Sequence, residues 1–293
     1  MLPYARRRRP TRLAMLAVAL AVLLFTAGAA FAGGSMSLPT FVPRTADQVT
    51  NLDILRLQLK RYYGTPAAAT GMAACDRDLA PAADSNYATE AAGVAADGAR
   101  WLSSGRRATS NAHTAIVLDV DDTALANWNY ELCSNWAFDP GTYGQFVTQQ
   151  RFPPVPGMVA MAGQAAARGY AVFYVTGRDA SQEAATLGNL THDGIGIDAG
   201  FPEPTTLPDG EDGLFVRPAV GAYPAYLDKP EFCAAAIAAH ATCPTVRFKS
   251  GVRAHLEDLG FEVVANFGDQ PSDLNDGFAD RTFKLPNPNY YLP

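Results

Sequence analysis

Residues 114–123 read TAIVLDVDDT, an apolar run that ends in acidic and hydroxyl side chains. A run this short and apolar predicts a buried strand of a parallel sheet. Asp119 and Asp121 follow the strand, at the end where open α/β sheets bind their ligands. A solvated hairpin end would tolerate the same acids, so the rest of the chain has to decide between the two interpretations.

The first 32 residues have the composition of an export signal. Five arginines precede an apolar run at 13–27, and small residues around Ala32 suit a cleavage site. We therefore expect a secreted or periplasmic protein that is cleaved near Ala32. A retained membrane anchor is the alternative, although the apolar run is shorter than the ~20 residues of a spanning helix. The arginines leave both Sec and twin-arginine export open.

Loss of this segment would leave a strongly acidic chain. The segment holds five of the 23 basic residues and none of the 29 acidic ones, so 18 basic residues then face 29 acidic ones and the net charge moves from −6 to −11. This balance argues against nucleic acid polymers as partners, because binding to a phosphate backbone depends on Lys and Arg. The remaining length, 33–293, fits one large domain with no stable membrane association.

Four cysteines remain after cleavage, at positions 75, 133, 233 and 243. An even number in an oxidising compartment predicts two disulfides, for which three pairings are possible. Cys233 and Cys243 are close in sequence, so we favour their pairing, with Cys75 and Cys133 as the complement. A zinc site is disfavoured because the chain has no Cys-x-x-Cys and its four histidines are scattered.

Three later segments also read as strands that end in polar residues. They end in Thr176-Gly177-Arg178, in Lys249-Ser250 and in the sequence GDQPSD at 268–273. Strands that alternate with helices predict a three-layer α/β/α fold around a parallel sheet, with all the polar ends on one edge. The expected strands are 170–175, 245–248 and 262–267, and the expected helices are 159–168, 181–190, 230–239 and 250–259.

Three other regions surround this expected core. Residues 45–103 predict an N-terminal helical segment, with helices at 46–60 and 85–103. Residues 124–155 are rich in aromatic side chains and predict a small cap that could stack on an organic leaving group. A packed peripheral layer held by Cys133 explains the same aromatic residues equally well. Residues 200–229 carry Pro, Gly and acids and predict a loop insertion.

The polar strand ends contain the groups that handle a phosphate with a hard cation. Mg²⁺ prefers oxygen ligands and usually takes one or two carboxylates, which Asp119 and Asp269 can supply together with the backbone carbonyl of Asp121. Lys249 offers a positive charge to phosphate oxygens. Thr176 and the backbone at Gly177 can donate hydrogen bonds, and glycine allows a phosphate to approach closely.

The same residues suggest a reaction. Asp119 can attack phosphorus and form an aspartyl-phosphate, a known role of carboxylate nucleophiles. Asp121 can then give a proton to the leaving oxygen and later accept one from water, and such proton transfer contributes ~10²–10⁴ in rate. Positioning and charge stabilisation would supply the rest of the acceleration.

These four motifs, in this order, resemble those of the haloacid dehalogenase (HAD) superfamily. The surrounding sequence is similar to its subfamily IIIB of secreted acid phosphatases, which includes plant vegetative-storage-type and bacterial proteins. The similarity extends to VPGM at 155–158, FYVTGR at 173–178 and KLPNPNYY at 284–291. It implies a Rossmann-like core, Mg²⁺-dependent hydrolysis of phosphomonoesters and an acidic optimum.

Carried over position by position, the resemblance makes Asp119 the nucleophile and Asp121 the acid/base. Thr176 and Lys249 would bind phosphate, and Asp269 would bind the metal with support from Asp273. The chain departs from the group at Gly177, where Asn is common, and over 201–229, which matches poorly and leaves substrate choice open.

Three side chains have two interpretations each at this stage. Asp122 can cap the following helix or act in the site. Arg178 can contact the leaving group or pair with a nearby acid. Asp273 can cap a helix or support the metal and its ligands.

The function that follows is a secreted acid phosphatase that acts on small phosphomonoesters, with nucleotides as candidates. A weakly catalytic binding or storage protein on the same fold is the alternative, as is a phosphotransferase in which an alcohol replaces water. The presence of Asp119 favours turnover. The natural substrate, the balance between hydrolysis and phosphotransfer, and the oligomeric state stay open.

Overall fold

The computed structural model describes residues 42–66, 68–69, 71–76, 78–104 and 113–292. The expected export signal at 1–32, and the anchor that is its alternative, lie outside these residues. No helix within the described ranges is both long and apolar enough to cross a membrane.

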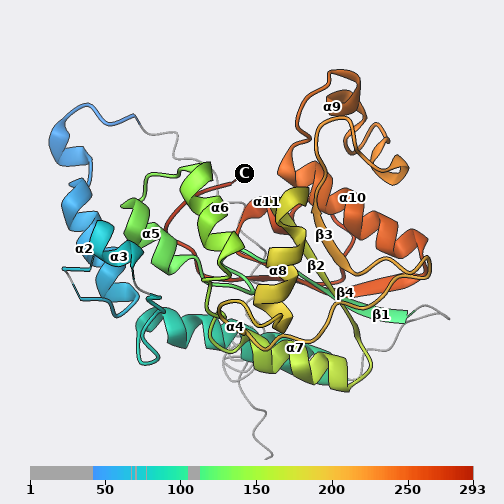
Figure 1. Ribbon diagram of the computed structural model, residues 1–293, viewed down its shortest axis with the longest axis horizontal. Helices are drawn as coiled ribbons and strands as arrows, with labels where there is room; N and C mark the ends of the chain where they lie inside the picture. Colours follow the sequence, from blue (N-terminus) through green and yellow to red (C-terminus); the bar gives the residue numbers. More distant parts are fainter. Residues whose placement is uncertain (1–41, 67, 70, 77, 105–112, 293) are drawn as a thin grey trace, which may run out of the picture. The chain divides into compact units, whose positions relative to one another are not determined.

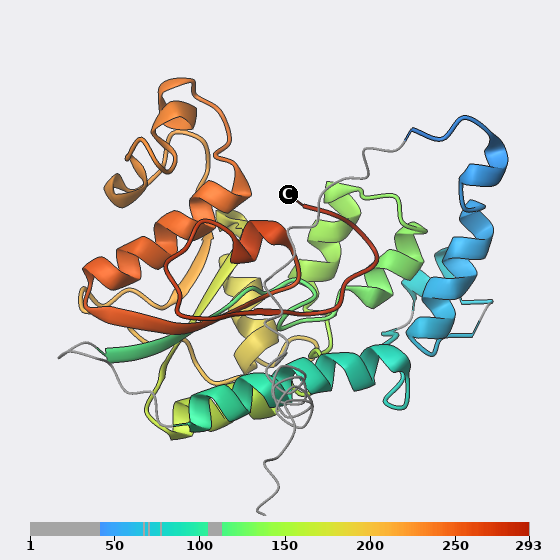
Figure 2. The same cartoon turned by 180° about the vertical axis from the view of Figure 1, so that it is seen from behind.

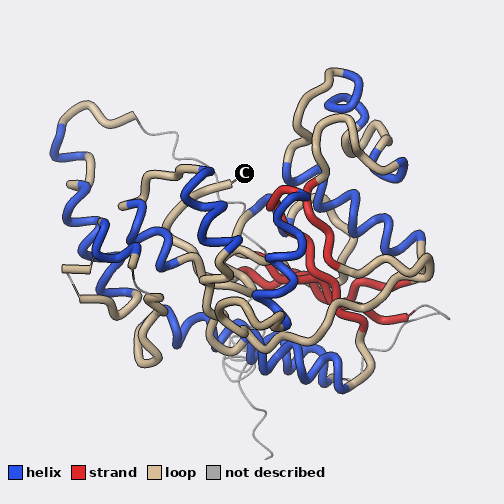
Figure 3. The backbone as a smooth tube through the Cα atoms, viewed as in Figure 1, coloured by secondary structure: helices blue, strands red, loops and turns tan. Residues whose placement is uncertain are grey.

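A five-stranded parallel sheet forms the centre of the fold, as the alternation of strands and helices predicted. Its strand order is β3-β2-β1-β4-β5, and every neighbouring pair is parallel. The strand that the opening sequence predicted is β1, and it pairs with β2 on one side and with β4 on the other. Figure 3 shows the strands in red. They are β1 (His113–Leu118), β2 (Ala171–Asp179), β3 (Leu214–Arg217), β4 (Phe261–Gly268) and β5 (Thr282–Lys284).

Helices cover both faces of the sheet. Successive side chains of a strand point to opposite faces, and those of β1 are apolar on both. Ile116 and Leu118 of β1 pack in one core with α4 (Asn86–Ser103), α7 (Met158–Ala167) and α8 (Glu183–Thr191). Ala115 and Val117 pack in a second core with α10 (Thr245–Asp258). Figures 1 and 2 show α4 and α7 on one face and α10 on the other. The predicted three-layer α/β/α architecture is confirmed.

One predicted strand is wrong. Residues 245–248 form the first turn of α10, which also takes in most of the helix expected at 250–259. The apolar residues Phe248, Val252 and Leu256 repeat every four positions and line one buried face, so the helical period continues across the supposed boundary. Lys249 consequently lies on a helix and not behind a strand.

Two short strands were not expected. β3 lies inside 200–229, so the loop prediction is wrong at Leu214–Arg217, and β5 follows the last expected strand. Both strands are short and sit at the edges of the sheet, where they gain their order from pairing with β2 and β4. Segments this short carry too little pattern to be recognised by themselves.

The remaining elements surround the sheet and are smaller. The expected helix at 46–60 is divided, because Asn51 caps α2 with its side chain and the residues before it form only a 3₁₀ turn. The helix expected at 230–239 is shortened to α9. These elements are η1 (Ala46–Gln48), α2 (Leu52–Tyr62), α3 (Met72–Cys75), α5 (Trp128–Ser134), α6 (Pro140–Thr148), η2 (Ala180–Gln182), η3 (Ala225–Leu227), α9 (Ala234–Ala238) and α11 (Pro271–Leu274).

Two disulfides are present, in the favoured pairing. Cys233 bonds to Cys243, and Cys75 bonds to Cys133. The second bond joins α3 to α5, which belongs to the expected cap at 124–155.

Candidate active site

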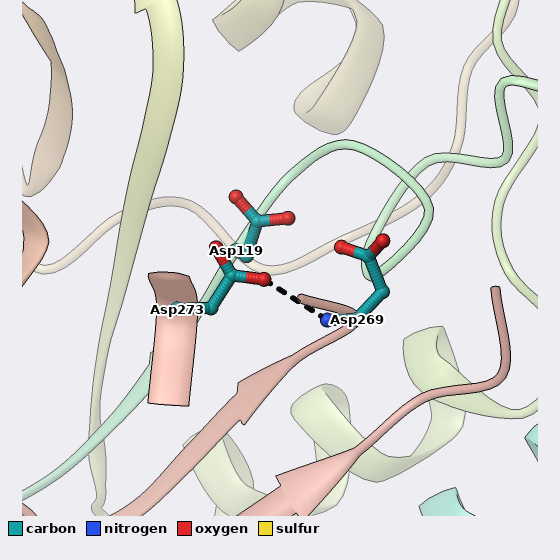
Figure 4. A group of neighbouring side chains, drawn as sticks. All are labelled: Asp119, Asp269 and Asp273. Atoms are coloured by element: carbon teal, nitrogen blue, oxygen red, sulfur yellow. Dashed lines mark hydrogen bonds between the residues drawn. The ribbon is translucent and has the colours of Figure 1, made fainter. Parts of the chain in front are cut away.

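Three carboxylates meet at the carboxyl ends of β1 and β4, where the strand order reverses direction. Asp119 follows β1, Asp269 follows β4, and Asp273 projects from α11. One oxygen of each lies within 4.8 Å of the others, and all three side chains are buried. Figure 4 shows the three side chains and the hydrogen bond that links Asp273 to the backbone of Asp269. This reversal point is where open α/β sheets bind ligands.

Lys249 reaches the same cluster from α10. Its Nζ donates hydrogen bonds to Asp119 and, at 2.7 Å, to Oδ1 of Asp273. Burial alone would lower the pKa of Lys249, but the two carboxylates outweigh it and raise the pKa above its ordinary value. Lys249 therefore meets Asp119 as expected, although residues 245–248 before it form a helix and not the expected strand.

Asp273 caps a helix, one of the two roles that the sequence left open, and it also contacts Lys249. Its Oδ2 accepts the backbone N–H groups of Asp269 (3.1 Å) and Gln270 (2.7 Å), which caps α11, while its Oδ1 accepts from Lys249. A Cβ at Gly268 would lie 2.3 Å from the Cβ of Asp273. Only glycine leaves room for Asp273 at this position.

Asp269 is held by three donors. They are Oγ1 of Thr123 at 3.3 Å, Nε2 of Gln270 at 2.6 Å and Nδ2 of Asn287 at 2.6 Å. Burial, together with repulsion from Asp273, raises the pKa of Asp269 and that of Asp119 well above the usual range. Buried carboxylates this close together fit a hard divalent cation, whose charge would offset theirs.

Asp121 lies beside this cluster and is engaged by other side chains. Nη2 of Arg178 donates to its Oδ1 at 2.7 Å, and the Tyr143 hydroxyl donates to the same oxygen at 2.5 Å. Burial would raise the pKa of Asp121, but the ion pair with Arg178 lowers it overall. Of the two interpretations of Arg178, the structure contains the ion pair. The role of the Asp121 backbone carbonyl as a metal ligand remains a prediction.

Thr176, Gly177 and Arg178 lie within β2, which continues to Asp179, and not in a turn behind it. The Thr176 hydroxyl is buried and accepts the N–H of Arg178 at 3.2 Å. Gly177 faces the cavity, and a Cβ added there would meet only Cγ2 of Thr245, at 3.9 Å. The room above Gly177 suits the close approach of a ligand.

Asp122 does not cap the helix that follows. Its Oδ1 accepts the N–H of Asn127 at 2.9 Å, and Asn127 is itself the residue that precedes α5. Asp122 is buried and adopts a left-handed φ of 53°, which is uncommon for any residue but glycine. Burial raises its pKa to about 8. Asp122 therefore braces the loop behind β1.

Residues 285–292, called here the closing segment, contain site residues that the sequence analysis missed. Nδ2 of Asn287 donates to Asp269 at 2.6 Å and to Asp122 at 3.3 Å. Asn289 donates to the Tyr63 hydroxyl at 2.9 Å and accepts from Nε1 of Trp136 at 3.2 Å. The resemblance of KLPNPNYY at 284–291 to the family was the only sequence signal for these residues, and it did not indicate their role.

A cavity of about 570 Å³ opens onto these groups. The aromatic side chains near the site divide between a packed layer and the cavity wall. Trp128 is buried and stacks on Tyr63 with ring centres 3.9 Å apart, so it belongs to the packed layer. Other aromatic side chains line the cavity with the carboxylates and Lys249, namely Tyr130, Trp136, Phe138, Tyr143 and Tyr290.

Comparison with known proteins identifies the family of this chain. Residues 74–211 and 234–293 match the family described as HAD superfamily, subfamily IIIB (acid phosphatase). The chain belongs to this family. The gap between the two matched ranges, 212–233, includes β3 and most of the region where the resemblance was weakest.

Curated relatives come from plants. The chain is 27% identical to acid phosphatase 1 of Solanum lycopersicum over 181 residues, which are 60% of this chain and 58% of the relative. It is 26% identical to the stem 28 kDa glycoprotein of Glycine max over 184 residues, 60% of this chain and 59% of the relative. It is 50% identical to vegetative storage protein 2 of Arabidopsis thaliana, but over only 48 residues, 16% of this chain and 18% of the relative. The first two matches span about three fifths of the relatives' length.

Among solved structures, the class C acid phosphatase from Bacillus anthracis is similar, with a TM-score of 0.52 and 17% identity. The match covers 82% of this chain and 86% of that chain. At this identity the similarity supports the fold.

Proposed function

We propose that this protein is an exported, Mg²⁺-dependent acid phosphatase that hydrolyses small phosphomonoesters through an aspartyl-phosphate on Asp119. The observation that carries the proposal is the meeting of Asp119, Lys249 and Asp269 beside one cavity, at the carboxyl edge of the sheet. A nucleophile, a cation for phosphate oxygens and a metal ligand are what phosphoryl transfer needs there.

In the first step, a carboxylate oxygen of Asp119 attacks phosphorus while the bond from phosphorus to the ester oxygen breaks. Asp121 gives its proton to the departing oxygen. In the second step, water attacks the phosphorus and gives a proton to Asp121, and the bond to Asp119 breaks. Asp119 and protonated Asp121 are then restored, and inorganic phosphate leaves.

Lys249 and β2 would hold the phosphate during both steps. The Lys249 ammonium is already fixed by Asp119 and Asp273, so little ordering is needed when a phosphate arrives. The open space above Gly177 would receive the phosphate against the backbone of β2.

Asp119, Asp269 and the backbone carbonyl of Asp121 are the proposed ligands of Mg²⁺. When bound, the ion would neutralise charge on the phosphate and on the buried carboxylates. Thr123, Gln270 and Asn287 would keep Asp269 in place, a role that partners of metal ligands often have.

The surroundings of Asp121 bear on its two proton transfers. The pair with Arg178 favours the ionised form, which is the form that accepts a proton from water. Donation to the leaving oxygen requires the protonated form, which becomes more abundant as pH falls. An acidic optimum follows from this requirement.

The aromatic residues of the cavity favour an organic leaving group with a flat or apolar surface, and nucleosides are candidates. Export is supported by the two disulfides, because such bonds persist in oxidising compartments.

Replacement of Asp119 by Asn tests the proposal. The amide keeps the size of the side chain but is a poor nucleophile, so kcat on p-nitrophenyl phosphate should fall by a factor on the order of 10³ or more. The circular dichroism spectrum should stay unchanged. Asp209→Asn, the same change at an exposed residue outside the cavity, serves as the control. Full activity of the Asp119→Asn protein would rule out the nucleophile assignment.

A further inference from the structure

Two residues that line the cavity, one at the N-cap of α5 and one within it, carry side-chain hydrogen-bond acceptors without partners. Asn127, at the start of the helix, is 3% exposed, and its Oδ1 is buried with no hydrogen-bond partner. Glu131 is 8% exposed, and among the described residues no donor bonds its carboxylate. Both residues line the cavity. Residues four apart lie on the same side of a helix, so the two acceptors are neighbours.

Buried acceptors without partners are costly, and a buried carboxylate without a cation is more so. The protein supplies no cation to Glu131 from the cavity wall. Of the cationic side chains that line the cavity in the described residues, Arg178 pairs with Asp121, Arg217 with Asp179, and Lys249 with Asp119 and Asp273. The missing partner is therefore expected to arrive with a ligand.

We propose that Asn127 and Glu131 form a subsite for an ammonium group on the leaving alcohol, which makes phosphomonoesters of short amino alcohols preferred substrates. The inference rests on the proposed phosphatase function. It assigns opposite charges of one substrate to different walls of the same cavity, the phosphate to Lys249 and the metal ligands, and the ammonium to α5.

The position of Asn127 sets the distance between the two charges. Asn127 lies beside Asp121, the proposed proton donor to the leaving oxygen, so the subsite begins beside the ester oxygen. Glu131 lies one helical turn further along, roughly 5–6 Å between Cβ atoms. An ammonium two or three carbons from the ester oxygen would reach both acceptors.

The neighbouring side chains suit a cation. Tyr130, Trp136 and Phe138 line the cavity with Glu131, and aromatic faces attract ammonium groups. The Trp136 side chain donates a hydrogen bond to Asn289. The chain turns there through two residues with left-handed φ, Asn135 (53°) and Trp136 (59°). Burial raises the pKa of Glu131 to about 7, and a bound cation would favour its ionised form.

The test compares 2-aminoethyl phosphate with propyl phosphate, which replaces the ammonium by a methyl group of similar size. We expect kcat/KM of the amino ester to exceed that of the propyl ester by about tenfold or more, as a charge-assisted contact would give. Equal values for the two esters would overturn the subsite. A third ester, 2-hydroxyethyl phosphate, should rank with the propyl ester, and parity with the amino ester would overturn the assignment to a cation.

Glu131→Gln keeps the shape of the side chain and removes its charge. The ratio of kcat/KM between the amino and propyl esters should fall toward one in this variant. Glu231→Gln, the same change at an exposed residue outside the cavity, should keep the ratio of the unmodified protein. An unchanged ratio in Glu131→Gln would contradict the role of Glu131.

The outcome separates this inference from the phosphatase proposal. Hydrolysis of p-nitrophenyl phosphate without preference for the amino ester would overturn the subsite alone. If no ester is hydrolysed, calorimetric binding of the amino and propyl esters to the unmodified protein decides the subsite by itself. Tighter binding of the amino ester, by about tenfold, supports it, and equal binding overturns it.

Discussion

At the scale of single residues, Tyr143 is the group whose contact with Asp121 has the clearest consequence. Its hydroxyl donates to Oδ1 of Asp121 at 2.5 Å, which stabilises the ionised carboxylate and holds its pKa down. Tyr143→Phe removes this bond and keeps the ring. The pKa of Asp121 should rise, so the limb of the pH–rate profile that reports Asp121 should move to higher pH by up to about one unit.

Profiles of kcat/KM against pH, recorded with p-nitrophenyl phosphate, measure this shift. Tyr130→Phe is the matched control, because the Tyr130 hydroxyl exchanges hydrogen bonds with the backbone of Asp139 and not with Asp121. A limb that moves to lower pH in Tyr143→Phe, or moves equally in both variants, would contradict the role assigned to Tyr143.

The two carboxylates that the sequence predicted most directly share one property, which is a position behind an apolar run. Asp119 and Asp269 follow β1 and β4 directly, so a local pattern marked them. Asn287 bonds Asp269 from the closing segment and Tyr143 bonds Asp121 from α6, and neither residue follows such a run. Asn287 lies 165 positions from Asp122, and only the folded chain brings the two together.

At the scale of elements, the closing segment completes the site from outside the sheet. Asn287→Ala would leave Asp269 with two of its three donors and remove a bond to Asp122. Loss of a partner that orients a metal ligand typically costs about 10- to 100-fold in metal affinity or activity. We expect the Mg²⁺ concentration that gives half-maximal activity to rise by about tenfold, with a matching loss in calorimetric Mg²⁺ affinity.

Asn289→Ala is the control within the same segment. The substitution removes the bonds to Tyr63 and Trp136, and neither of these bonds involves a site carboxylate. The affinity for Mg²⁺ should therefore change much less in Asn289→Ala than in Asn287→Ala. An unaltered Mg²⁺ affinity in the Asn287→Ala protein would show that the closing segment does not position Asp269.

Other elements show where sequence patterns stop being informative. The helix α4 was predicted nearly residue for residue, because its Ser85 cap and its buried alanines agree. The start of α10 was misread as a strand, since residues 245–248 alternate polar and apolar side chains over a span too short to separate the two periods. β3 and β5 depend on their neighbours for order, and their own residues do not reveal them.

At the scale of the whole molecule, the buried acids link stability to pH and to metal. Burial raises the pKa of Asp122 to about 8 and that of Glu131 to about 7, and it also raises those of Asp119 and Asp269. Between the ordinary carboxyl pKa near 4 and these values, the folded chain binds more protons than the unfolded chain. Without metal, the free energy of unfolding should therefore fall as pH rises from about 5 to about 8.

Mg²⁺ should reverse part of this loss, because a bound cation favours the ionised carboxylates. The rise in Tm on adding Mg²⁺ should be larger at pH 8 than at pH 5. Thermal unfolding with Mg²⁺ and with EDTA, at both pH values, measures the difference. A rise that is equal at the two pH values, or larger at pH 5, would argue against a cation among these acids.

The measurement that tests the central claim most directly is hydrolysis of p-nitrophenyl phosphate by residues 33–293 at pH 5 to 6, with Mg²⁺ and with excess EDTA. The arrangement of Asp119, Lys249 and Asp269 predicts turnover with Mg²⁺ and its loss with EDTA, restored when Mg²⁺ is returned. A folded protein that shows no turnover under either condition would contradict the phosphatase assignment and favour a binding or storage protein on the same fold.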